Sequence, residues 1–159
     1  MTDPVFQELL VRWFQFGCFT PIFRVHGQRH PNEDPTNCGS GGGPNEVWTF
    51  NHSTEIRQTM ALREKIRPYV EQHLLITSET GIPILTPMFF HFKDIDCYTA
   101  QDQFMFGTEY LVAPVYVYQA SSRKVYLPVL ENGAQWVHHY SGQPYTGGKW
   151  YTINTTLAD

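Results

Sequence analysis

The sequence predicts an α/β region followed by an all-β region: the final β/α units of an incomplete (β/α)8 (TIM) barrel, and then an antiparallel β-sandwich. Three observations lead to this fold class. Residues 1–81 contain two stretches of helical periodicity and one apolar stretch typical of a strand. A glycine-rich loop precedes the second helix, and residues 82–159 contain only short β-rich stretches. A barrel that ends and passes into a β domain has this order of elements. We therefore place a domain boundary between residues 81 and 82.

The first helix is predicted from its cap and from one apolar stripe. Asp3 can cap the helix, and Pro4 suits its first position. Apolar side chains then recur at intervals of three or four residues, at Val5, Leu9, Trp13 and Phe16. Gly17 is expected to end the helix. We expect Trp13 and Phe16 to lie in the core.

Residues 18–26 predict a short strand with little alternation, buried on both faces as in a parallel sheet. Such a strand has no sheet partners among residues 1–81, so we expect this half of the chain to be incomplete. Residues 27–51 follow without periodicity, and a loop of this length is usually functional or disordered.

A second helix is predicted from about Thr54 to Glu79, bent or interrupted by Pro68 and closed at Gly81. Short β-rich stretches separated by turn signals follow it, at residues 82–92, 103–118, 124–127, 135–140 and 150–153. These stretches predict the antiparallel sandwich.

The composition excludes several classes of protein. The net charge of −4 offers no basic surface for nucleic acid. No stretch approaches the roughly 20 apolar residues that span a membrane, and the first residues lack the features of a signal peptide. Three cysteines cannot form a disulfide framework. We expect a soluble protein, cytoplasmic or secreted.

Several long segments match one known family in the same order. They are ELLVRWFQFG running into CFTPIFRVHG at residues 8–27, LREKIRPY at 62–69, residues 81–92, DQFMFG at 102–107, LVAPV at 111–115, VYLP at 125–128 and YSG at 140–142. The first two resemble the end of the catalytic barrel of glycoside hydrolase family 31 and its last helix. The others resemble the start of the family's C-terminal β-sandwich. The likeness covers nearly the whole chain.

The resemblance implies a retaining α-glycosidase that hydrolyses terminal α-linked xylose or glucose from oligosaccharides. In this family one aspartate attacks the anomeric carbon, and a second protonates the leaving oxygen. Both lie on earlier barrel strands, and neither motif occurs here. We expect no catalytic residue in this chain, no activity from it alone, and no cofactor. Its expected partners are an α-linked oligosaccharide substrate and the missing N-terminal part of the same enzyme.

Three positions are candidate site residues. His26 matches the family histidine that hydrogen-bonds the sugar in the −1 subsite, and the C-terminal end of a barrel strand is where such sites lie. Arg24 could pair with an active-site carboxylate or hold the rim of the barrel. Trp48 could line the sugar cleft or pack in the core. The sequence of residues 44–48 favours the α-xylosidase branch.

The first alternative is a carbohydrate-binding β-sandwich module without hydrolytic activity. It would require an exposed row of aromatic rings, for which the candidates are Trp136, Tyr140, Trp150 and Tyr151. Burial of the same rings would instead favour a core.

The second alternative is a metal site within the loop-rich region, made of His26, His30, Cys38 and His52. Their spacings form no paired zinc-ligand motif, so we expect no metal. The third is an acid–base pair from Asp94 and Asp96, or from His138 and His139. Neighbours this close along a strand do not obviously converge on one substrate.

Overall fold

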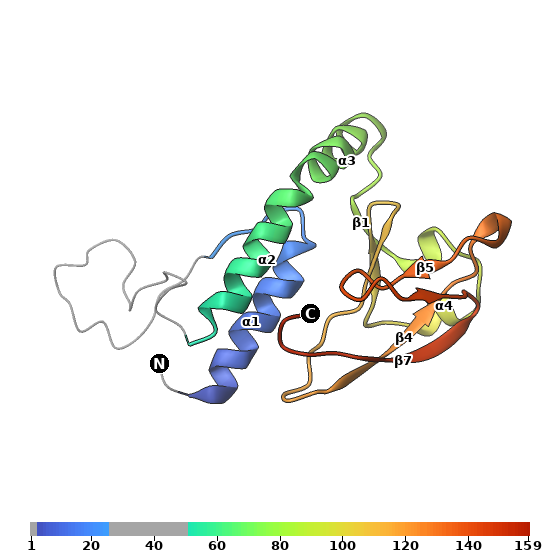
Figure 1. The fold of residues 1–159 in the computed structure, drawn as a ribbon. Coiled ribbons are helices and arrows are strands. Elements are labelled where there is room, and N and C mark those ends of the chain that lie inside the picture. Colours follow the sequence, from blue (N-terminus) through green and yellow to red (C-terminus); the bar gives the residue numbers. More distant parts are fainter. Residues whose placement is uncertain (1–2, 26–50) are drawn as a thin grey trace.

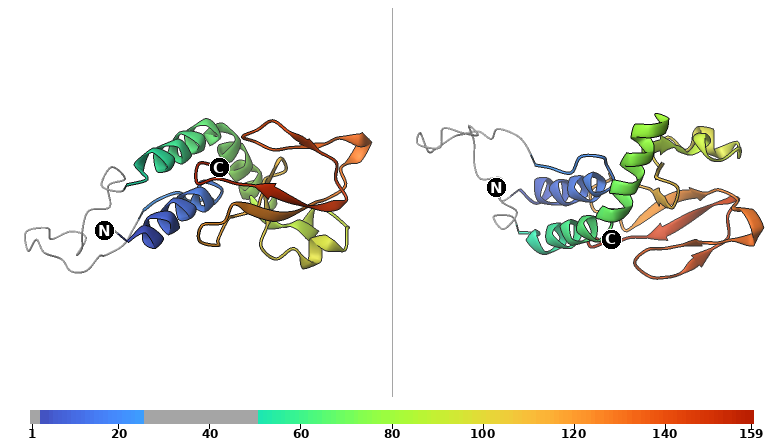
Figure 2. Two further views of the ribbon diagram at one scale, coloured as in Figure 1. Left: turned by 60° about the horizontal axis from the view of Figure 1, so that its bottom comes forward. Right: turned by 90° about the horizontal axis from the view of Figure 1, so that it is seen from above.

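The computed structural model describes residues 3–25 and 51–159, which form a helical part and a strand-rich part (Figure 1). Helices α1 (Pro4–Cys18) and α2 (Ser53–Lys65) lie side by side, and α3 (Arg67–Thr80) follows α2 after a one-residue break. Both views of Figure 2 place the helices along one side of the strand-rich part. No helix in these described ranges is long and apolar enough to cross a membrane.

Helix α1 begins as predicted. The Asp3 carboxylate accepts a hydrogen bond from the Val5 backbone N–H at 3.0 Å, and Pro4 occupies the first helical position. The helix ends at Cys18, one residue beyond Gly17.

The prediction that Trp13 and Phe16 lie in the core is wrong for Trp13. Val5, Leu9 and Trp13 are 48%, 49% and 60% exposed, and only Phe16 is half-buried. A different face packs against α2, and its buried residues are Gln7, Val11, Phe14 and Cys18. Both faces have helical spacing, so the sequence alone did not show which one meets a partner within this chain.

The second predicted helix is divided as Pro68 indicated. Ile66 separates α2 from α3, and Pro68 is the second residue of α3, where its missing N–H costs no helical bond. Gly81 closes α3 in the left-handed conformation, with φ of 75°. Ile66 and Val70 are buried in one cluster with Cys18, Ile84 and Phe106.

The strand-rich part is built from antiparallel sheets, which confirms the predicted fold of the second half. The strands are β1 (Leu85–Pro87), β2 (Phe104–Phe106), β3 (Tyr110–Val112), β4 (Ser122–Leu127), β5 (Trp136–Val137), β6 (Pro144–Tyr145) and β7 (Lys149–Asn154). They pair as β1-β2-β3, β4-β7 and β5-β6, all antiparallel. Short helical turns interrupt them, η2 (Met88–Phe90), α4 (Asp96–Thr99) and η3 (Glu131–Gly133). Several strands are shorter than the β-rich stretches that predicted them, because turns at Gly107 and after Pro87 divide those stretches.

Contacts that join the two parts include hydrogen bonds from Tyr69 on α3 and from two polar side chains of α1. The Tyr69 hydroxyl of α3 donates to the Phe106 carbonyl at 3.0 Å and accepts from the Glu109 N–H at 3.1 Å. The end of the chain returns to α1, where Arg12 donates to the Thr156 carbonyl at 3.1 Å and Gln15 to the Leu157 carbonyl at 2.9 Å. Figure 1 shows the C-terminus beside α1.

Candidate functional site

The residues that lead toward His26 follow α1 directly. We call residues 19–25 the α1 exit. They form no strand in the structure, so the strand predicted over residues 18–26 is wrong for the part that is described. Cys18 is the last residue of α1, and no strand of the described chain pairs with the backbone of the α1 exit. A strand of the parallel type needs such neighbours for its backbone hydrogen bonds.

Around the start of the α1 exit, backbone carbonyl groups accept hydrogen bonds from a side chain of α2 and not from a neighbouring strand. The Arg63 guanidinium donates through Nη1 to the carbonyl oxygens of Cys18 and Thr20, at 2.6 and 2.7 Å. Its Nη2 donates to the Pro21 carbonyl at 3.0 Å. One side chain therefore satisfies three carbonyl groups within four consecutive residues.

Packing of Phe23 extends this anchoring further along the α1 exit. The Phe23 ring meets Phe14 edge to face, with 5.8 Å between centroids, and the Arg63 guanidinium lies 5.9 Å from its centre. Gly17 allows the approach, since a β-carbon there would lie 3.2 Å from the ring. The Thr20 hydroxyl lies 2.8 Å from the carbonyl oxygens of Gly17 and Ile22.

The surroundings of Cys18, next to the Arg63 contacts, indicate a structural role for its thiol. Burial raises the pKa of the Cys18 thiol to about 11, against the opposing effect of the Arg63 charge. Its Sγ lies 3.7 Å from the Thr59 carbonyl. Partial burial lowers the pKa of Arg63, and a guanidinium keeps its charge in proteins. The site therefore presents a neutral thiol and a fixed cation, with no activated nucleophile at Cys18.

Of the three predicted site residues, the structure describes one. Arg24 is exposed on the α1 exit, and its role in pairing or at the rim stays a prediction. His26 and Trp48 lie outside the described residues, as do His30 and Cys38 of the alternative metal site. The remaining member of that set, His52, faces Glu55 at 3.7 Å. Residues 3–25 and 51–159 hold no group of three metal-ligating side chains.

The candidate acid–base pairs hold loops in place. The Asp94 carboxylate accepts from the Tyr126 hydroxyl at 3.1 Å and from the Val129 N–H at 3.0 Å. Burial first, and then this hydrogen bond, raise the pKa of Tyr126 to about 12. Asp96 accepts from the Trp150 indole at 2.9 Å. Asp94 in the loop after η2 and Asp96 at the start of α4 thus bond to side chains of the paired strands β4 and β7.

The two histidines of the other candidate pair make different contacts. His138 shares a hydrogen bond of 2.8 Å with the Ser141 hydroxyl across the β5–β6 turn. His139 is exposed by its surface area, yet it lines a small pocket against α2, where partial burial and the charge of Lys65 lower its pKa. Both histidines lie in the β5–β6 turn, and no hydrogen bond joins them in the described part of the chain.

The aromatic rings of the β-rich half are used in packing. The Trp136 indole donates to the Pro128 carbonyl at 2.9 Å, and both Trp136 and Trp150 pack on the core around Met88. Tyr151 donates to the Thr146 carbonyl at 2.8 Å. Tyr140 is the ring of this set that is mainly exposed. This arrangement favours the core interpretation over a row of sugar-binding rings.

Sequence reasoning missed two features. Arg63 belongs to the LREKIRPY segment, but no local sequence pattern indicates that its side chain reaches the end of α1. A cavity of about 320 Å³ also lies between α1 and the sheets, lined mainly by apolar side chains such as Phe16, Phe19 and Leu127. Arg12 lines it too, and its Nε is the buried side-chain polar atom without a partner in the described residues.

Comparison with known families gives the context for this arrangement. The model of the glycosyl hydrolases family 31 TIM-barrel domain matches residues 2–72, and the model of the glycosyl hydrolase family 31 C-terminal domain matches residues 81–159. The chain belongs to glycosyl hydrolase family 31. The family resemblance found in the sequence is therefore confirmed, together with the fold class of a barrel end followed by a sheet-rich domain.

Similar proteins within the family include enzymes of several specificities. The chain is 30% identical to a sulfoquinovosidase from Escherichia coli over 95% of its length, and 31% identical to an α-xylosidase from Saccharolobus solfataricus over 96%. It covers 20% and 19% of these two relatives, so it spans about a fifth of their length.

Solved structures of the family follow the same path of the backbone. A GH31 α-xylosidase from a soil metagenome, complexed with xylose, superposes with a TM-score of 0.88 at 38% identity. This likeness covers 98% of the chain and 24% of that enzyme. A xylosidase from Aspergillus niger gives a TM-score of 0.86 at 26% identity, over 99% of the chain and 23% of that enzyme. The chain thus has the fold of the corresponding part of these enzymes, and no strand of its described residues pairs with the α1 exit.

Proposed function

We propose that this chain is part of a retaining α-glycosidase that hydrolyses terminal α-linked xylose or glucose from oligosaccharides. The observation that carries the proposal is the match of both family models, in order, to residues 2–72 and 81–159. The likeness to an α-xylosidase complexed with xylose supports xylose as one of the two sugars. Because the chain spans about a fifth of its relatives, the activity is proposed for the longer enzyme.

Both catalytic aspartates are proposed to lie outside this chain, and the contacts of the described aspartates support this; Asp34 lies outside the described residues. Asp3 caps α1, and Asp94 and Asp96 hold the loop after η2. The Asp102 carboxylate accepts from Arg123 and from the Tyr116 hydroxyl, both at 2.8 Å. Asp159 accepts from the Thr156 N–H at 2.7 Å. Each of these carboxylates accepts hydrogen bonds that hold the fold together. No two of them form the opposed pair that retaining hydrolysis requires.

His26 is proposed to hydrogen-bond the sugar in the −1 subsite, with Arg24 and Trp48 at the rim of the active site. The support is the RVHG segment together with the anchoring of the α1 exit just before it. A preorganised donor or acceptor at the sugar strengthens its hydrogen bond in the transition state and so accelerates the reaction. The domain boundary between residues 81 and 82 is part of the same proposal, supported by the end of α3 at Gly81.

Hydrolysis of aryl glycosides tests the proposed function. The full-length enzyme that contains this chain is expected to release nitrophenol from 4-nitrophenyl α-xyloside or α-glucoside with retention, as followed by NMR of the first sugar product. The purified 159-residue chain is expected to release none. Activity of the short chain would contradict the placement of the aspartates. Activity of the long enzyme on an aryl α-sulfoquinovoside alone would contradict the choice of sugar.

A further inference from the structure

We propose that Arg63 is a positioning residue of this glycosidase, which acts by fixing the α1 exit and, through it, the sugar contact of His26. The inference rests on the proposed function and adds a residue to it. It is argued from the described contacts of Arg63 with the end of α1 and with the α1 exit.

The end of α1 needs a cation that α1 does not supply. The last carbonyl groups of a helix have no intrahelical partner and carry partial negative charge. The last turn of α1 contains no basic residue. Arg63 approaches from α2 and donates to the Cys18 carbonyl at 2.6 Å. It therefore satisfies the helix end and complements its dipole from a neighbouring element.

The planar shape of the guanidinium suits the two carbonyl groups that follow. Nη1 also donates to Thr20, and Nη2 donates to Pro21, at 2.7 and 3.0 Å. A lysine at this position would keep the charge, but its compact ammonium lacks the rigid fork that reaches separated acceptors. The geometry thus distinguishes arginine from a simple positive charge.

The fixed segment extends close to the proposed sugar contact. The Arg63 guanidinium also lies over the Phe23 ring, which is held between Phe14 and Gly17. Only Arg24 and Val25 separate Phe23 from His26 in the sequence. Loosening this anchor would therefore change the freedom of the backbone just before His26. Misplacement of a substrate-binding group by about 1 Å can cost up to about a hundredfold in rate.

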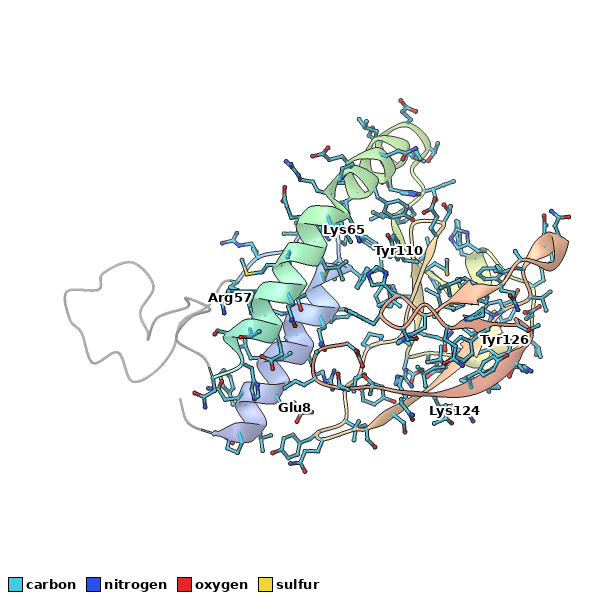
Figure 3. All side chains as sticks on the ribbon, in the orientation of Figure 1. Glu8, Arg57, Lys65, Tyr110, Lys124 and Tyr126 are labelled. Carbon is cyan, nitrogen blue, oxygen red and sulfur yellow. The ribbon has the colours of Figure 1, made fainter. Side chains whose placement is uncertain are left out.

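A set of variants in the full-length enzyme tests this role. Arg63→Gln is expected to lower kcat/KM by about tenfold, mainly through kcat, and Arg63→Lys to recover only part of the loss. The matched control is Arg57→Gln on the same helix. The Arg57 side chain is exposed and extends away from α1 (Figure 3), and its exchange is expected to change kcat/KM by less than about twofold.

A double-mutant cycle with His26→Ala separates positioning from general stability. If Arg63 acts through His26, Arg63→Gln in the His26→Ala background should change kcat/KM by less than about twofold. If the losses in kcat/KM of the two single variants multiply fully in the double variant, the inference is overturned. An Arg63→Gln enzyme that keeps its kcat/KM beside an active wild type would also overturn it. An inactive wild type would instead overturn the proposed function.

Hydrogen exchange supplies a readout that does not depend on activity. Arg63→Gln is expected to speed amide exchange at residues 19–25, while Arg57→Gln leaves exchange in that segment unchanged. Mass spectrometry measures the exchange, with each variant held equally far below its own melting temperature. Unchanged exchange in the Arg63→Gln variant would overturn the inference even if its activity fell.

Discussion

The Tyr69 hydroxyl occupies the space that a β-carbon on Gly107 would need. Gly107 lies at the turn between β2 and β3 with φ of 62°, and the same hydroxyl hydrogen-bonds Phe106 and Glu109 on either side of it. A glycine in one part of the molecule and a tyrosine in the other therefore form a single joint between α3 and the first sheet. Tyr110, which follows this turn, packs edge to face on Tyr69.

This joint predicts that Gly107→Ala is strongly destabilising. The left-handed conformation costs an alanine about 1 kcal/mol, and displacement of Tyr69 should raise the loss in free energy of unfolding to about 3 kcal/mol. Gly142→Ala is the matched control, because Gly142 has φ of 70° and no atom near its missing β-carbon. It should lose about 1 kcal/mol only. Urea unfolding followed by tryptophan fluorescence measures the free energy of unfolding of both variants. Equal losses in the two variants would show that the clash with Tyr69 does not contribute.

The exposed stripe of α1 predicts self-association of the isolated chain. Val5, Leu9 and Trp13 are about half exposed or more, and adjacent apolar side chains on one helix face promote aggregation. A variant with Val5→Ser, Leu9→Gln and Trp13→Gln should stay monomeric at concentrations where the wild type does not. Light scattering after size-exclusion chromatography gives the masses. A monodisperse wild-type monomer would contradict the expectation.

The ion pair of Asp102 and Arg123 predicts a small stabilisation that depends on pH. The hydrogen bond from Arg123 is the main cause that lowers the pKa of Asp102. A carboxyl group with a lowered folded-state pKa stabilises the protein above its unfolded pKa of about 3.9, and the contribution is lost as the pH falls through the folded value.

Asp102→Asn should therefore reduce the free energy of unfolding at pH 7 by less than about 1 kcal/mol, since the carboxylate is partly exposed. The difference from wild type should shrink toward zero when urea unfolding is repeated in acid. A difference that stays constant with pH would show that packing, and not charge, is responsible.

The two described cysteines should react slowly in the folded protein. Burial raises the pKa values of Cys18 and Cys97 to about 11. At pH 8 this lowers the thiolate fraction on the order of a hundredfold relative to an exposed thiol. Peptide mapping after brief treatment with iodoacetamide should find both residues unmodified in buffer and modified in urea. Modification of Cys18 in buffer would indicate that the α1 exit opens.

Local rules predicted the features that depend on local chemistry. The cap at Asp3, the break before Pro68 and the closure at Gly81 each follow from one residue's backbone preferences, and all three are found. The antiparallel character of the β-rich half followed from turns and short apolar stretches. These features need no knowledge of distant parts of the chain.

The features that failed depend on partners distant in the sequence. Helical spacing predicts Trp13 in the core, but α2 covers the face of Val11 and Phe14 instead. Residues 19–25 have the composition of a strand, yet a strand exists only beside other strands. The role of Arg63 arises from a contact across 45 residues, which no local pattern contains.

The bond between Gln15 and the Leu157 carbonyl spans 142 positions of the chain. During synthesis the ribosome makes α1 first and Leu157 almost last within this stretch. At about 5–20 residues per second, the helix waits for many seconds before this contact can form. Over that interval Leu157 cannot yet cover Val11 and Phe14, the side chains with which it finally packs. A newly made chain therefore has a window in which chaperones or neighbouring nascent chains can reach α1.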